Sequence, residues 1–296
     1  INDWRLVDAY GLASVYADQG QWEHVLKVKS RHLDLAGGED RVQLLMEMGD
    51  ISASKLGNRA QAIQDYSAAL DERPDDRRVL TKLMQLYTEE RDWNRLVDVI
   101  LRLAEFLDDS LQKSKYLNSA AKVLARELGD TDRALALWDQ VIDLDPSNAK
   151  AFSDSIQIQR DRGTFSGVEQ LLLRRLATLG ESDKTTRIEV QRALGELYER
   201  QLGDRDRAIA AYEQALELLG DDASLRAHLA GLYVEAPEQY FAQAVEAHGA
   251  LLRADLGRTD SLRALRKLYT DVKRADASWC LCQALTVLGR AEPDEE

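Results

Sequence analysis

The apolar and small residues of segment 187–222 follow the spacing of two amphipathic helices joined by a polar corner. Residues three and four apart lie on one face of a helix. The residues that form such faces here are Leu194, Gly195, Tyr198, Ala208, Tyr212, Ala215 and Leu216. We expect the small Gly195 and Ala208 where the two helices approach closely, with the tyrosines filling the space beside them. Neither helix can bury its apolar face alone, so the segment predicts neighbouring units.

The same arrangement occurs in two earlier segments, 41–76 and 113–148. In all three, a small residue of the first helix is followed 13 residues later by an alanine of the second helix. These pairs are Gly49 and Ala62, Ala121 and Ala134, and Gly195 and Ala208. The corners are Leu56-Gly57-Asn58, Leu128-Gly129-Asp130 and Leu202-Gly203-Asp204. We expect each corner glycine to end a helix with a positive φ. Since Tyr66, Trp138 and Tyr212 recur at one repeat position, we expect them in the core.

Shorter units alternate with these long-corner units. They span 4–36, 77–110 and 149–181, and the aromatic residues after their corners, Trp22, Trp93 and Phe165, are spaced by 71 and 72 residues. The real period is therefore a double repeat of about 72 residues. Weaker copies at 222–257 and 259–290 complete eight helix pairs, as expected of terminal repeats.

The order of small residue, tyrosine, alanine, aromatic residue, alanine and proline resembles the tetratricopeptide repeat family, apart from one extra residue in the long corner. The resemblance covers nearly the whole chain. It implies an all-α, right-handed α-solenoid of about eight stacked antiparallel helix pairs, with first helices lining a concave groove. We therefore predict one solenoid domain over 1–290 and an acidic, disordered tail at 291–296.

Composition agrees with helices and argues against several classes of protein. The chain has only 4 Pro and 4 Phe, and it is dense in helix formers. Its net charge of −13 argues against nucleic acid as the main partner, since phosphate binding needs a basic face. No apolar run of about 18 residues occurs, so we expect no membrane insertion and a cytoplasmic location. Because the chain begins Ile1-Asn2 without a signal-peptide pattern, we expect an excerpt of a longer protein.

No motif in the chain carries chemistry. The four histidines lack metal-ligand spacing, and we expect Cys280 and Cys282 to be buried, reduced thiols. Paired acids at 75–76, 108–109 and 221–222 precede helices, where aspartate caps the N-terminus, and we favour that role over metal binding. We therefore predict no catalytic residue, no metal, no cofactor and no enzyme activity.

The resemblance to the family also assigns the residues that face the groove. The predicted partner-binding residues are Lys115, Asn118, Lys122, Arg126, Lys150, Gln157, Arg160 and Arg192. This basic lining favours a protein–protein scaffold or adaptor whose middle groove binds an acidic segment or a C-terminal carboxylate. The N-terminal units instead offer Val7, Tyr10, Gln43 and Met46, a lining that favours apolar side chains of a partner.

Two alternatives to this hypothesis stay open. The basic residues are also consistent with a solvated face that balances acidic loops. The whole chain is also consistent with a rigid spacer or self-assembly segment of a larger protein. Exposed apolar residues in the last repeat, namely Trp279, Leu281 and Leu285, would favour that second alternative.

Overall fold

The computed structural model describes residues 3–220 and 222–293, with side chains from residue 11 onward. The chain divides into two compact units, residues 1–151 and 152–296, and each is described by itself. The single domain predicted for 1–290 stays a prediction. Within the described residues every regular element is a helix, so the predicted all-α fold is confirmed.

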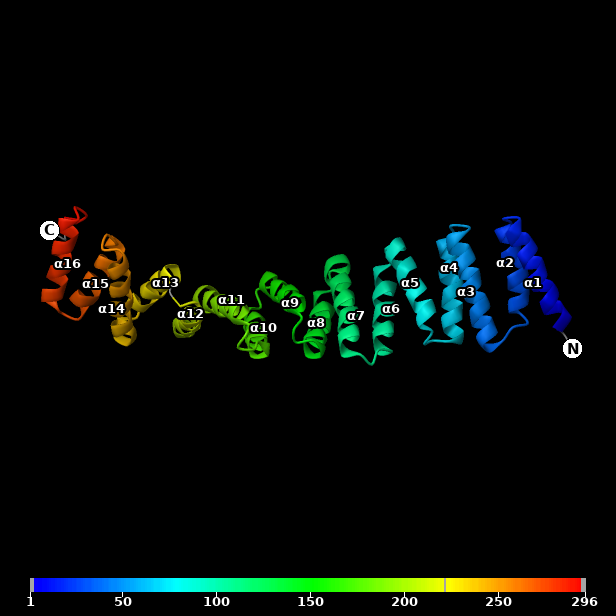
Figure 1. Ribbon diagram of the computed structural model, residues 1–296, viewed down its shortest axis with the longest axis horizontal. Coiled ribbons are helices and arrows are strands. Elements are labelled where there is room, and N and C mark those ends of the chain that lie inside the picture. The colour runs from blue at the N-terminus through cyan, green and yellow to red at the C-terminus, as the bar shows by residue number, and fades with distance from the viewer. Residues whose placement is uncertain (1–2, 221, 294–296) are drawn as a thin grey trace. The chain divides into compact units, whose positions relative to one another are not determined.

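The first unit consists of successive antiparallel helices (Figure 1), each packed on its neighbours in sequence. They are α1 (Asp3–Asp18), α2 (Trp22–Leu33), α3 (Gly38–Ser54), α4 (Arg59–Glu72), α5 (Arg77–Glu90), α6 (Trp93–Glu105), α7 (Ser110–Val123), the π-helical turn η1 (Leu124–Leu128) and α8 (Thr131–Leu144). The next helix, α9 (Ala149–Asp161), begins in this unit and continues into the second.

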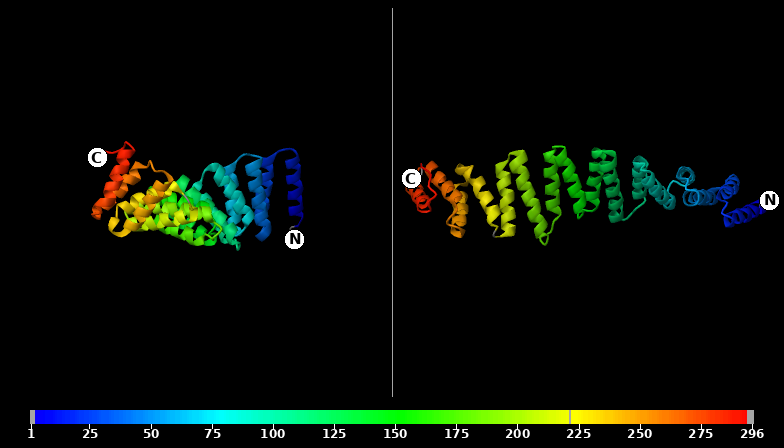
Figure 2. Two further views of the ribbon diagram at one scale, coloured as in Figure 1. Left: turned by 60° about the vertical axis from the view of Figure 1, so that its left-hand side comes forward. Right: turned by 90° about the horizontal axis from the view of Figure 1, so that it is seen from above.

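The second unit has the same construction, which Figure 2 shows from two further directions. Its helices are α10 (Phe165–Thr178), α11 (Lys184–Leu197), the π-helical turn η2 (Tyr198–Leu202), α12 (Arg205–Leu219), α13 (Ala223–Val234), α14 (Pro237–Ala254), α15 (Thr259–Asp271) and α16 (Ala275–Val287). Over the described residues the helices form the eight predicted pairs. Of the predicted tail, residues 294–296 lie outside the described part, and Glu292 forms an ion pair with Arg263 at 2.9 Å.

A wider helical turn absorbs the extra residue of the long corners. Helices α7 and α11 end in the turns η1 and η2, after which Gly129 and Gly203 have φ values of 68° and 64°. The next N–H group, that of Asp130 or Asp204, donates to the carbonyl six residues back at 2.9 Å. Gly57, three residues after the end of α3, has a φ of 65°. The predicted positive φ is confirmed, and it suits glycine because this residue has no Cβ.

The short corners close more tightly and tolerate other residues. Gly20 and Gly163 have positive φ, but so do Arg91 and Lys273, at 57° and 60°. In all four corners the next N–H group donates to the carbonyl five residues back, at 2.8–2.9 Å. Long and short corners thus alternate through residue 203, as the double period predicts.

The expected close approach of paired helices occurs at the small residues. A Cβ atom added at Gly49 or Gly195 would lie 2.5 Å from a ring carbon of Tyr66 or Tyr212, respectively. In the remaining long-corner unit, 113–148, Ala121 is fully buried and Trp138 is 2% exposed. The three aromatic residues therefore belong to the core, as predicted.

The paired acids act as helix caps, as predicted. The second acid of each pair, Asp76, Asp109 or Asp222, accepts hydrogen bonds from backbone N–H groups at the start of α5, α7 or α13. These bonds satisfy N–H groups that have no partner within the helix.

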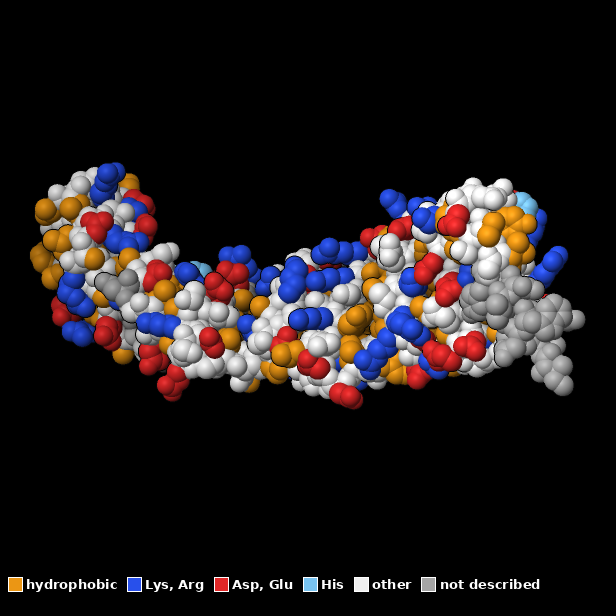
Figure 3. Space-filling model, turned by 45° about the vertical axis from the view of Figure 1, so that its right-hand side comes forward, with side chains coloured by type: hydrophobic (Ala, Val, Ile, Leu, Met, Phe, Trp, Pro, Cys, Tyr) orange, Lys and Arg blue, Asp and Glu red, His pale blue; other side chains and the backbone are white. Residues whose placement is uncertain are grey.

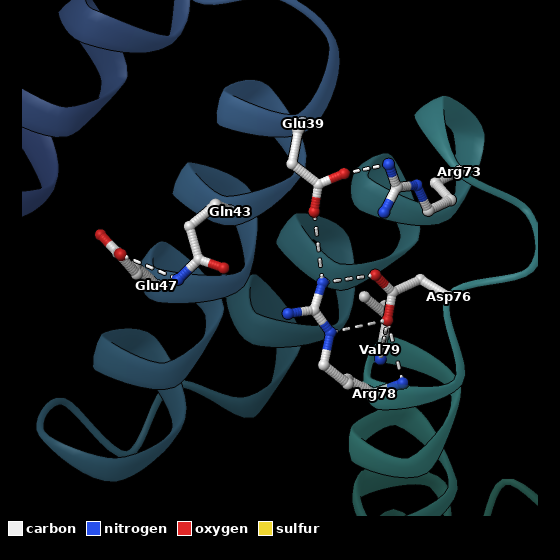
Figure 4. A network of polar contacts seen from close by, with 7 residues as sticks. All are labelled: Glu39, Gln43, Glu47, Arg73, Asp76, Arg78 and Val79. Carbon is white, nitrogen blue, oxygen red and sulfur yellow. Dashed lines mark hydrogen bonds and ion pairs between the residues drawn. The ribbon is translucent and has the colours of Figure 1, made fainter.

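One of these caps also joins three helices of the first unit (Figure 4). The guanidinium of Arg78 donates to Asp76 at 2.8 Å and lies 3.6 Å from Glu39 at the start of α3. Glu39 in turn pairs with Arg73 at the end of α4. The hydrogen bond from Arg78 holds the pKa of the Asp76 carboxyl below its usual value.

Candidate protein-interaction surface

The basic residues predicted for the middle groove gather on α7 and η1. This segment, 110–128, holds one acidic residue, Glu127, and four basic ones, Lys113, Lys115, Lys122 and Arg126. Lys115 and Arg126 are exposed and Lys122 is half-buried. Within the described part of the chain, none of these three has an ion-pair partner. Their positive charge is therefore left uncompensated by direct contacts.

The core holds Asn118 in one orientation on this face. The indole N–H of Trp138 donates to Asn118 Oδ1 at 2.9 Å. Since an indole nitrogen only donates, the amide oxygen must face it, and the amide NH₂ group remains for other acceptors. Asn118, Lys115, Lys122 and Arg126 are spaced by three and four residues along the segment. We call these four residues the α7–η1 surface, and its outward polar groups are all donors.

The same repeat position is chemically different in α3. The hydroxyl of Tyr66 donates to Asp50 Oδ1 at 2.6 Å, and Lys82 from α5 pairs with the same carboxylate. Asp50 directly follows the small residue Gly49, just as Lys122 directly follows Ala121. Between α3 and α5 the charges therefore cancel, whereas on α7 they do not.

A third version of this contact occurs in the second unit. Glu199 in η2 accepts a hydrogen bond from the hydroxyl of Tyr212 at 2.9 Å and contacts His228 Nε2 at 2.8 Å. Burial alone would raise the pKa of Glu199, but the hydrogen bonds from His228 and Tyr212 outweigh it and lower the pKa. The core aromatic of each long-corner unit thus bonds a polar residue of its first helix. Sequence reasoning placed these aromatics correctly and missed their acceptors.

The other predicted site residues divide between the units. Lys150 is exposed at the start of α9. In the second unit, Gln157 donates to Asp161 at 2.7 Å, and Arg192 lies 3.9 Å from Asp222. Arg160 is one of the residues around a pocket of about 340 Å³. The others around it are Phe165, Glu196, Leu197, Arg200 and Gln201.

The apolar lining predicted for the N-terminal groove is only partly present. The side chains of Val7 and Tyr10 lie outside the described residues, and Gln43 donates to Glu47 at 3.0 Å. Met46 is 6% exposed, so placing it in the groove was wrong; its side chain packs in the core instead. The pocket between α3 and α5, about 440 Å³, has a charged lining that includes Asp50, Lys82 and Glu89. A more apolar pocket of about 420 Å³ lies between α1, α2 and α3 and includes Ala13, Ala17, Trp22, Val25 and Ile51.

Residues 192–226 match the family model of the tetratricopeptide repeat. That segment contains the contact of Gly195 with Tyr212 and the corner at Gly203, and both features recur in the first unit at Gly49 and Gly57. Residues 192–226 therefore carry a tetratricopeptide repeat.

Three solved structures of tetratricopeptide-repeat proteins are among those similar to this chain. YrrB, described as having an unusual peptide-binding site, is 17% identical over 62% of this chain and 93% of its own, with a TM-score of 0.40. The C-terminal part of a repeat protein from Cytophaga hutchinsonii is 15% identical over 84% and 97%, with a TM-score of 0.41. A repeat protein from Parabacteroides merdae is 14% identical over 90% and 99%, with a TM-score of 0.36. No curated protein matches the sequence.

Two further properties of the described residues concern membrane insertion and metal binding. None of their helices combines the length and the hydrophobicity that a membrane span needs. They contain no group of three or more His, Cys, Asp and Glu side chains placed to hold a metal ion. The cytoplasmic location and the absence of enzyme activity and of cofactors stay predictions for this chain.

Proposed function

We propose that this chain is a non-catalytic scaffold or adaptor whose α7–η1 surface binds an acidic segment of a partner protein. The fold itself is that of protein-interaction scaffolds in general. The observation that carries the finer proposal is the set of donors on α7 and η1 that have no carboxylate partner among the described residues.

The chemistry of these donors selects an acidic ligand. Lys115, Lys122 and Arg126 carry full positive charges, and Asn118 adds an amide NH₂ group. Carboxylates accept from such groups in short, charge-assisted hydrogen bonds that are about twice as strong as neutral ones. The α3–α5 pocket offers no such selectivity, because Lys82 is already paired with Asp50.

The surface also requires little ordering when a ligand binds. Asn118 is held by Trp138, and Lys122 is half-buried on a folded helix. Binding an extended segment then costs mainly the ordering of the ligand and of the exposed side chains. In the second unit we propose Arg160, in its pocket, as a further carboxylate contact. Gln157 and Arg192 already contact Asp161 and Asp222, and they and Lys150 would contribute less.

The test uses the whole chain and two pools of fluorescein-labelled peptides, one acidic and one basic, of equal length and apolar content. Fluorescence anisotropy should detect binding of the acidic pool, with an affinity that falls as salt screens the charges. The double substitution Lys122→Glu/Arg126→Glu should weaken binding at least about tenfold, because two attractions become repulsions. Equal binding of both pools would refute the role of charge.

Lys113→Glu is the matched control. It reverses one charge on the same helix, half the charge change of the double variant, two residues from Lys115 and therefore about 200° around the helix axis. It should leave both affinity and salt dependence close to those of the unchanged chain. If the double variant behaves like this control, the α7–η1 surface is not the binding site.

A further inference from the structure

Helix α16 differs in character from the rest of this charged chain. Its one charged residue, Asp276, lies in the first turn, and residues 277–289 contain none, although 31% of the whole chain is charged. On the inner side Leu285 is fully buried, and Leu281 and Cys282 are half-buried. The solvated helices of a globular protein normally carry charges on their outer side.

The outer side of α16 is apolar and open. Trp279 is 64% exposed and Val287 is 85% exposed. Gln283 and Thr286 lie between them on the same face and are also exposed. Figure 3 shows hydrophobic side chains gathered at the end of the second unit where α15 and α16 lie. The sequence predicted that Trp279, Leu281 and Leu285 would be exposed. Trp279 is exposed, but Leu285 is buried because it faces α15, and Leu281 is half-buried.

The repeat shows what normally covers this position. Trp279 lies six residues after the positive-φ corner residue Lys273, as Val97 lies six after Arg91 and Ile209 six after Gly203. Val97 and Ile209 are each 1% exposed. The residues at the same position in the other corners, 26, 63, 135 and 169, are half-buried, so Trp279 is the most exposed of the set. The helices of Val97 and Ile209, α6 and α12, pack against the first helix of the following pair, α7 or α13, whereas α16 packs against α15. The outer face of α16 therefore continues the interface between repeats, with no covering helix among the described residues.

We propose that this face, formed by Trp279, Gln283, Thr286 and Val287, docks against the same face of a second copy of the chain. Its neutrality favours a second copy over an oppositely charged partner, which would gain no ion pair here. Two copies with a net charge of −13 each repel one another in general. A two-fold contact brings identical surfaces together, and an uncharged face is where two copies approach at the least electrostatic cost.

The spacing along α16 sets the geometry of the pair. Trp279 and Val287 are eight residues apart, or about 12 Å along a helix axis. If the two helices run antiparallel about an axis at Gln283, Trp279 of each copy packs on Val287 of the other. A tryptophan buries about 150–250 Å². One helix face is small beside the roughly 1,200 Å² of the smallest stable interfaces, so the dimer should be reversible and of micromolar affinity.

Sedimentation equilibrium of the 296-residue chain, from micromolar to submillimolar concentration in a reducing buffer, tests this proposal. The mass should rise from monomer to dimer with concentration. Val287→Glu should raise the dissociation constant at least about tenfold, which is about 1.4 kcal/mol. Circular dichroism should confirm folding, since an exposed residue is changed. A monomeric mass at every concentration would overturn the proposal.

Two matched variants complete the test. Leu256→Glu changes a leucine of the same unit that is 75% exposed but lies outside α16, and it should leave the dimer intact. Cys280→Ser should also retain the dimer, because the association is non-covalent; the exposure of Cys280 contradicts the buried thiol expected there. A dimer that survives Val287→Glu, or one that Leu256→Glu abolishes equally, would refute this face as the interface.

Discussion

The contact of Gly195 with Tyr212 gives the sharpest test of how the paired helices pack. Replacing Gly195 by alanine would place a Cβ atom 2.5, 2.6 and 2.7 Å from three carbons of the tyrosine ring. Carbon atoms normally pack at about 3.5–4.0 Å, so the overlap is about 1 Å. The ring has little freedom to retreat. Tyr212 is buried, its hydroxyl donates to Glu199 at 2.9 Å, and its ring packs nearly perpendicular to the ring of His228, with the centroids 5.0 Å apart.

Two effects of opposite sign decide the magnitude. Overpacking a core costs about 1–3 kcal/mol. Replacing glycine by alanine within a helix stabilises the folded state by about 0.5–1 kcal/mol, because alanine loses less backbone entropy on folding. We therefore expect Gly195→Ala to destabilise the chain by about 1–2 kcal/mol, and the larger Gly195→Leu to cost about 2–4 kcal/mol.

A double-mutant cycle separates the two effects. Tyr212→Leu removes the ring, so in that background Gly195→Ala should stabilise by about 0.5–1 kcal/mol from helix propensity alone. Urea denaturation followed by circular dichroism gives the free energies of unfolding. Hydrogen exchange in α11 and α12 is a local check, because repeats can unfold in stages. Equal effects of Gly195→Ala in both backgrounds would refute the close contact. Gly49 and Tyr66 provide a second, independent copy of the cycle.

Three further predictions concern caps, a buried histidine and the corners. Asp76→Ala should cost about 1–2 kcal/mol through the lost cap. Since the folded pKa of Asp76 is lowered, chiefly by its hydrogen bond from Arg78, thermal melts should show this cost above about pH 4 and its loss as the pH falls through the folded pKa. Burial lowers the pKa of His248, so stability should begin to fall below about pH 6.5, and His248→Phe should remove that dependence in the same melts. Arg91→Gly and Lys273→Gly should each stabilise by about 0.5–1 kcal/mol in urea, because an L side chain at positive φ is strained.

Matched changes nearby keep these predictions specific. Asp75→Ala, one residue before the cap and exposed, should stay within about 0.5 kcal/mol. Arg95→Gly, inside α6, should destabilise by about 1 kcal/mol, opposite in sign to Arg91→Gly. A cost of Asp76→Ala that persists well below pH 4, an acid dependence that remains in His248→Phe, or a destabilising Arg91→Gly would each contradict the corresponding argument.

The helix pairs and their long corners were predictable because local chemistry specifies them. Apolar residues three and four apart make a helix face, and a corner that needs positive φ selects glycine, as at Gly57, Gly129 and Gly203. A positive φ does not, however, require glycine. Arg91 and Lys273 adopt the same backbone conformation in the shorter corners, where the surrounding hydrogen bonds impose it on residues that local preference would not place there.

The candidate site was predictable only as a set of residue types. The register of the repeat predicts that Lys115, Asn118, Lys122 and Arg126 face the groove, and that assignment stays a prediction. In the structure they lie three and four residues apart along α7 and η1. Whether such charges are available to a partner depends on residues far away in the chain. Lys82 and Asp50 are 32 residues apart and cancel each other, while Lys122 has no partner among the described residues.

By itself, then, the sequence determined the repeat, the core aromatics and the residue types along each first helix, because all of these depend on spacing within a few helical turns. Tertiary structure alone decided three other features. The hydrogen bond from Trp138 fixes the orientation of the Asn118 amide, Met46 packs in the core, and Trp279 stays exposed on the outer face of α16. Each of these features depends on which surfaces come into contact when the helices stack. A periodic sequence pattern does not specify the distances between helices.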